Sequence, residues 1–104
     1  MFATRWTILL RGSLLAVFLA VAGCQSAPVQ EMSDARQAIT VAKEAGAAEF
    51  ASAELKAAMD FLTSAERSLN RREYTQARDN AMQAKVKALD ALKVSEASQD
   101  DNGN

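Results

Sequence analysis

Alanine residues recur every three or four positions in the C-terminal half of the chain, and this spacing limits the folds that the sequence can adopt. The most regular run extends from Tyr74 to Ser95 and contains Ala77, Ala81, Ala84, Ala88 and Ala91. Residues three and four apart share one face of an α-helix, whereas strands require an alternation of two. Small side chains also let helix axes approach toward about 8 Å, the low end of the usual range. The pattern therefore predicts an all-helical protein with closely packed, antiparallel helices.

We expect residues 33–97 to fold as a short antiparallel three-helix bundle, formed by a helical hairpin and a shorter N-terminal helix. The first helix is predicted at about 34–45, with Ser33 as its N-terminal cap. Gly46 follows it directly and supplies a C-terminal stop. Its apolar face repeats at spacings of three and four, through Ala35, Ala38, Ala42 and Ala45.

The second and third helices form the predicted hairpin. Ser52 is a candidate cap for the second helix, and Asn70 can adopt the left-handed conformation that ends it. The third helix is predicted to begin near Glu73. The apolar stripe of the second helix consists of Leu55, Ala58, Leu62, Ala65 and Leu69, and Met59 is expected to widen it.

A second apolar face on the third helix contains Met82, Val86 and Leu89, about 100° to 140° around the axis from Tyr74. One neighbouring helix cannot cover both faces, so the third helix is expected to contact the first helix as well as the second. The alternative is that this second face binds another subunit, making a homo-oligomer, or an envelope protein partner.

The N-terminal segment, residues 1–23, has the organisation of a secretory signal peptide. Arg5 and Arg11 form a basic region, and an uncharged apolar run covers the 11 residues 12–22. A spanning helix needs roughly 17 to 25 apolar residues, and Arg11 interrupts any extension toward the N-terminus. An uncleaved membrane anchor is therefore the less favoured alternative.

The single cysteine lies at the end of this apolar run, in the tetrapeptide Val21-Ala22-Gly23-Cys24. This tetrapeptide resembles the lipobox of bacterial lipoproteins, which implies cleavage between Gly23 and Cys24 and attachment of acyl chains to Cys24. An incidental cysteine in an ordinary signal peptide is the alternative. Gln25 stands where enterobacterial sorting would place an inner-membrane retention signal, Asp. The resemblance thus implies an outer-membrane lipoprotein on the periplasmic face, with the inner membrane less favoured.

The mature chain would comprise 81 residues, with 10 Lys and Arg against 13 Asp and Glu. This acidic balance does not indicate nucleic-acid binding. Residues 24–32, the lipidated cysteine and a polar segment containing Pro28, are expected to form a flexible tether. Residues 98–104 are polar and acidic, and are predicted to be a disordered tail.

Several short segments together resemble a small lipoprotein domain of unknown function from Gram-negative bacteria. Relatives with this domain are often joined to an OmpA-like peptidoglycan-binding domain, which implies a place in the cell envelope. The sequence to Asn104 contains no such second domain, so peptidoglycan binding is not carried over. The segments that carry the resemblance are 35–39, 46–47, 54–58, Ala65 and 73–78, followed by the repeated alanines.

The residues that usually perform catalysis are missing or dispersed. The chain has no histidine, which removes the commonest general base and metal ligand. It also lacks a glycine-rich phosphate loop and a second cysteine for a metal cluster. We therefore expect no enzyme activity, no catalytic residue, no metal and no cofactor, and the sequence identifies no small-molecule substrate.

One cluster of charge is notable. Arg67, Arg71 and Arg72 surround the predicted turn between the second and third helices. The simplest interpretation is that they stabilise the negative C-terminal end of the second helix. The functional interpretation is that the tether holds this turn near the membrane, where the arginines contact anionic lipid headgroups.

These patterns favour a non-catalytic lipoprotein, anchored to the outer membrane through Cys24, that acts as a structural or protein-interaction module in the periplasm. The alternative is a binding module that sequesters an envelope peptide or lipid in an apolar groove beside Met82, Val86 and Leu89.

Overall fold

The computed structural model describes residues 26–103, which contain four helices and no strand. These helices are α2 (Val29–Glu44), α3 (Ala47–Phe50), α4 (Ser52–Asn70) and α5 (Tyr74–Asn102). The all-helical prediction is confirmed for this part of the chain. The single turn α3, between the first and second predicted helices, was not predicted.

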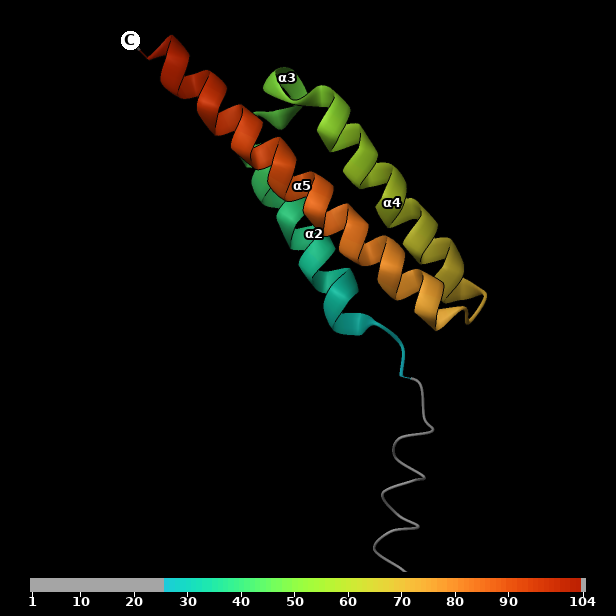
Figure 1. Cartoon of the computed structure of the whole chain (residues 1–104). Helices are drawn as coiled ribbons and strands as arrows, with labels where there is room; N and C mark the ends of the chain where they lie inside the picture. The colour runs from blue at the N-terminus through green and yellow to red at the C-terminus, as the bar shows by residue number, and fades with distance from the viewer. Residues whose placement is uncertain (1–25, 104) are drawn as a thin grey trace, which may run out of the picture.

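Helix α5 is the element against which the other helices pack. Its contacts with α4 are the most extensive, those with α2 come next, and α2 touches α4 less. Figure 1 shows α4 and α2 alongside α5 over much of its length. The predicted alanine stripe makes these contacts, and its members are fully buried at 0% exposure: Ala77, Ala81, Ala84, Ala88, Ala91 and Ser95. Ser95 satisfies its hydroxyl inside the core by donating a hydrogen bond to the Ala91 carbonyl.

Long-range hydrogen bonds fix the relative direction of α2 and α5. Near the start of both helices, Arg78 donates to the Ser26 carbonyl at 3.3 Å. Near the end of α2, the Gln99 amide donates to the Ala45 carbonyl at 2.6 Å. Helix α2 therefore runs in the same direction as α5. Helix α4, which lies between them in the sequence, runs in the opposite direction. The α4–α5 turn thus lies at the same end of the molecule as the start of α2.

The core is thin because most buried side chains are small. One cluster joins Ile39 and Leu55 to buried alanines of α2, α3, α4 and α5, and a second joins Met32 to alanines of the three long helices. Leu62 packs against both clusters. Met59, expected to widen the apolar stripe of α4, is instead 42% exposed. Close approach of the alanines brings the helix backbones together, which leaves this larger side chain at the margin of the contact.

Helix α2 begins at Val29, five residues earlier than predicted, and so includes part of the expected tether. Pro28 precedes its first residue and is buried, and Met32 in the first turn is only 2% exposed. Proline suits a helix start because the first N–H groups lack intrahelical acceptors. Ser33 is an exposed residue inside the helix and not its cap. Burial of Met32 against α4 and α5 explains the earlier start, because helix ends are stabilised by tertiary packing.

Helix α5 continues to Asn102, so the expected disordered tail is helical over residues 98–102. Ser98 donates to the Val94 carbonyl, and Gln99 reaches across to α2. Gln99 satisfies one of the carbonyl groups that the end of α2 leaves without an intrahelical partner. This hydrogen bond between α5 and the end of α2 stabilises the helical conformation of the polar segment.

Gly46 ends α2 as predicted, and its backbone φ of +87° places it in the left-handed region. Its N–H donates to the Lys43 carbonyl, and its own carbonyl accepts from Glu49 and Phe50 at the start of α3. A β-carbon at this position would lie 3.2 Å from the Phe50 ring. Glycine is therefore favoured here for its conformation, and a larger residue would also press against the Phe50 ring.

We predict that Gly46→Ala lowers the free energy of unfolding by about 1–2 kcal/mol, because alanine is strained at positive φ. Thermal denaturation followed by circular dichroism measures the change. Gly103→Ala is the matched control, since Gly103 has an ordinary φ of −80° and should change little. Equal melting temperatures for the two variants would contradict this account of the α2–α3 turn.

Candidate functional site

The predicted signal peptide, residues 1–23, and the predicted lipidation and cleavage positions Gly23 and Cys24 lie outside the described residues. Within residues 26–103, no helix is long and apolar enough to cross a membrane. The candidate sites in the described region are two surfaces of the helical unit, at the α4–α5 turn and on α5.

The chain that follows Cys24 joins the folded unit almost at once. The Ser26 carbonyl accepts a hydrogen bond from Arg78, and Pro28 is buried. Arg78 also donates to Glu31 of α2 at 3.3 Å, and both side chains are about one-third exposed. One α5 side chain thus holds both the entering segment and the first turn of α2. The sequence gives no signal for this contact, because its partners lie about 50 residues apart.

The candidate lipid-contact residues Arg67, Arg71 and Arg72 are brought together at the α4–α5 turn, and we call them the arginine turn. Helix α4 ends there in a Schellman motif, in which the N–H of Glu73 donates to the Ser68 carbonyl and that of Arg72 to the Leu69 carbonyl. Arg72 holds the left-handed position, with φ of +61°. Asn70, predicted to take that conformation, is the last residue of α4 instead. The left-handed residue thus comes two residues later than predicted, with Arg71 as the C-cap and Arg72 after it.

We predict that Arg72→Gly raises the free energy of unfolding by about 0.5–1 kcal/mol, because glycine adopts positive φ without steric cost. Chemical denaturation measures the change. Arg71→Gly serves as the control, because Arg71 has φ of −87° and glycine brings no conformational gain there. A loss of stability in Arg72→Gly would show that the arginine side chain itself stabilises the turn.

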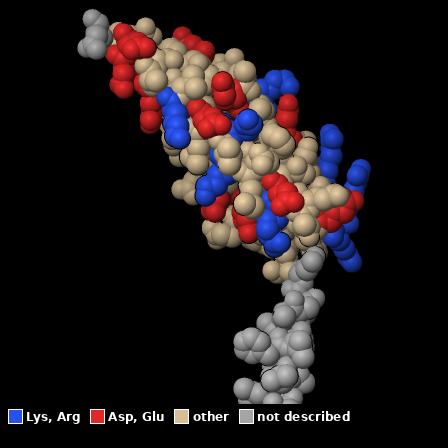
Figure 2. Space-filling model, in the orientation of Figure 1, with Lys and Arg blue, Asp and Glu red and all other residues tan. Residues whose placement is uncertain are grey.

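The arginine turn is exposed, and none of its three guanidinium groups forms an ion pair with a carboxylate of the described residues. Arg67 lies in the last turn of α4, where a cation is favourable near the helix C-terminus. Arg71 and Arg72 lie beyond the helix. Figure 2 shows basic side chains projecting at the end of the molecule from which the N-terminal trace leaves.

Met82, Val86 and Leu89 form a second candidate surface, the α5 stripe. Their exposed fractions are 53%, 49% and 40%. Helix α5 does contact α2, as expected, but through the alanine stripe and polar residues beside it. The expectation that the α5 stripe would cover α2 is wrong. The alanine face of α5 makes the close contacts with both α2 and α4, and the larger side chains of the stripe are left facing outward. The alternative expectation, that the stripe binds a partner, stays a prediction.

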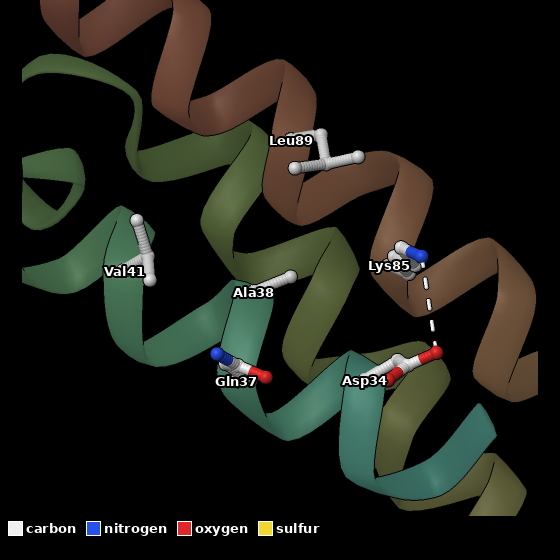
Figure 3. Close-up of a pocket in the computed structure, with 6 residues that line it drawn as sticks. All are labelled: Asp34, Gln37, Ala38, Val41, Lys85 and Leu89. Carbon is white, nitrogen blue, oxygen red and sulfur yellow. Dashed lines mark ion pairs between the residues drawn. The ribbon is translucent and has the colours of Figure 1, made fainter. Parts of the chain in front are cut away.

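A shallow groove runs between α2 and α5 along one edge of this stripe (Figure 3). Its volume is about 230 Å³, and an ion pair of 3.9 Å between Lys85 and Asp34 lies across one side of it. Small-molecule sites usually enclose about 300–1,000 Å³ and bury most of the ligand. The groove therefore suits one side chain of a docked partner better than an enclosed ligand. It is lined by Asp34, Gln37, Ala38, Val41, Lys85 and Leu89.

The described residues contain no group of three or more Cys, Asp or Glu side chains placed to hold a metal ion. All polar side-chain atoms that are buried in this region have hydrogen-bond partners. The Asp and Glu side chains of the described residues are all exposed or half-buried.

The fold and these surfaces define a small all-helical domain whose buried contacts are made mainly by alanine. Residues 30–102 match the family described as a domain of unknown function, DUF4398, and the chain belongs to this family. No curated protein and no solved structure matches the chain. The resemblance to a domain of unknown function is thereby confirmed.

Proposed function

We propose that this chain is a non-catalytic lipoprotein, anchored through Cys24 to the periplasmic face of the outer membrane, that presents an antiparallel three-helix bundle as a protein-interaction module. The observation that carries the proposal is the joining of the chain to the folded unit at Ser26, directly after the lipobox-like tetrapeptide. A lipid on Cys24 would therefore hold the bundle close to the membrane in a limited range of orientations.

The α5 stripe supports an interaction role. Met82, Val86 and Leu89 follow one another along the helix with spacings of four and three, on the face opposite the buried alanines. Apolar side chains grouped on an exposed helix face are typical of binding surfaces. Val41 of α2, 39% exposed, lies across the groove from Leu89 and extends the surface toward α2.

The alternative role, sequestration of an envelope peptide or lipid, requires a groove deep enough to enclose its ligand. The groove of about 230 Å³ beside Leu89 is small for that purpose. The geometry therefore favours docking of a folded protein partner over enclosure of a ligand.

A photo-reactive amino acid at position 86, introduced into the lipidated protein in intact cells, tests the proposed interaction. We expect a discrete crosslinked product of defined mass. The control places the same amino acid at Thr63, an exposed residue of α4 outside the stripe. No product from position 86, or the same products from both positions, would contradict the proposed interaction surface.

A further inference from the structure

We propose that the arginine turn binds phosphate groups of anionic lipid headgroups, so that the bundle stands on the membrane with its α4–α5 turn against the lipid surface. This inference rests on the proposed anchoring of Cys24 and deepens it by naming the orientation of the bundle and the chemistry of the contact.

Chain length places the arginine turn near the lipid. Ser26 is held by Arg78, which is in the second turn of α5, and Cys24 precedes Ser26 by two residues. Two residues span at most about 7 Å between Cα atoms. The far end of α5, at Asn102, lies 24 residues beyond Arg78, about 36 Å along the helix. A lipid on Cys24 must therefore enter the membrane beside the end that carries Arg71 and Arg72.

The charge of this end is suited to phosphate. Glu31 and Glu66, which lie on neighbouring helices, are already paired with Arg78 and Arg36. Glu73 lies in the turn itself and Asp79 is exposed in the second turn of α5, so the three arginines outnumber these two carboxylates and a net charge of +1 remains. Helices α2 and α5 both begin at this end while only α4 finishes there, so the helix dipoles add to the positive potential.

The backbone conformation of Arg72 supports a binding role for this residue, independently of the charge at this end of the molecule. An arginine at φ of +61° carries a steric cost that glycine would not. The Schellman motif would form at least as well with glycine, so folding of the turn does not explain the arginine. A guanidinium group at this projecting position presents a planar donor set that matches phosphate oxygens in two-point contact.

The opposite end of the molecule would be repelled by the same surface. Glu96, Asp100 and Asp101 are exposed in the last two turns of α5. Figure 2 shows acidic side chains gathered at this end. The separation of charge along the helices thus favours the same upright orientation that the short connection to Cys24 imposes.

Hydrogen–deuterium exchange of the lipidated protein, reconstituted in vesicles, tests this contact. Exchange of residues 70–76 should slow about fivefold or more on vesicles containing phosphatidylglycerol, compared with pure phosphatidylcholine, as expected for one headgroup contact. The difference should fall in high salt, which shortens the range of electrostatic attraction. It should disappear in the triple variant Arg67→Gln, Arg71→Gln, Arg72→Gln, and persist only in part when the same residues are changed to lysine, which keeps the charge but not the two-point contact.

The control variant Lys43→Gln, Lys56→Gln, Lys93→Gln removes the same charge from exposed residues of the far half of the bundle and should retain the difference. Equal exchange on the two vesicles, or equal loss in both glutamine variants, would overturn the proposal. Slowing by inorganic phosphate on neutral vesicles would also overturn it, because that result indicates a free-anion site. Flotation with the vesicles reports separately on anchoring: protein that floats without slowed exchange refutes the headgroup contact alone, whereas protein that does not float refutes the anchor.

Discussion

Replacing Ala84 by leucine should lower the melting temperature by about 5–20 °C. Ala84 is fully buried, in the cluster that includes Met32, Ala35 and Ala65 of the neighbouring helices. Three additional carbon atoms at this seam would force the helices apart and cost about 1–3 kcal/mol. In a domain of this size, each kcal/mol corresponds to about 4–8 °C. Thermal unfolding followed by circular dichroism measures the effect.

The matched control for this substitution is Gln83→Leu. Gln83 precedes Ala84 in α5 and is exposed, so the same side chain enters the same helix without meeting a neighbour. Its melting temperature should remain close to that of the parent protein. Equal melting temperatures for Ala84→Leu and the parent would show that the alanine seam is not closely packed.

The Cys24→Ser substitution should abolish lipid labelling and leave the precursor unprocessed. The thiolate of cysteine is the nucleophile that accepts the diacylglyceryl group, and a serine hydroxyl is far less reactive. Labelling of cells with a radioactive or alkyne fatty acid, followed by electrophoresis, measures both attachment and cleavage.

Gln25→Ser is the control for this experiment, because it changes the neighbouring residue and keeps the thiol. It should be labelled and cleaved as the parent protein is. Normal cleavage of Cys24→Ser would instead indicate an ordinary secretory signal, and an unlabelled, membrane-bound parent protein would indicate an uncleaved anchor.

The parts of the fold that were predictable depend on local patterns. The alanine spacing of α5 identified its buried face, since a 3.6-residue period can be read without knowing the neighbouring helices. Gly46 was recognisable as a stop because only glycine adopts its conformation without cost. Helix α4, Ser52 to Asn70, lies within two residues of the predicted second helix, but Ser52 is its first residue and not its cap, which is Ala51, and Asn70 is its last residue and not the left-handed stop.

The parts that were not predictable depend on contacts between distant residues. The early start of α2 follows from burial of Met32, and the late end of α5 follows from the bond between Gln99 and Ala45. Without these contacts, the polar residues at the start of α2 predict a tether and those at the end of α5 predict a disordered tail.

The sequence pattern also could not predict that the α5 stripe faces outward. Two faces of α5 had helical spacing, and the larger side chains, Met82, Val86 and Leu89, were the more apparent candidates for the contact with α2. The alanine face makes that contact because small side chains permit the closest approach of two helices. The arginine turn was recognised as a cluster, but its proximity to Ser26 through Arg78 required the structure.

Mass spectrometry of the N-terminal peptide, from protein isolated in the membrane fraction, tests the proposed anchoring most directly. After digestion at arginine and lysine this peptide would extend from Cys24 to Arg36. The account predicts that it begins at Cys24 and carries a diacylglyceryl group on Sγ and an acyl group on its amine. A peptide that contains an unmodified Cys24, or that is still preceded by residues of the 1–23 segment, would contradict it.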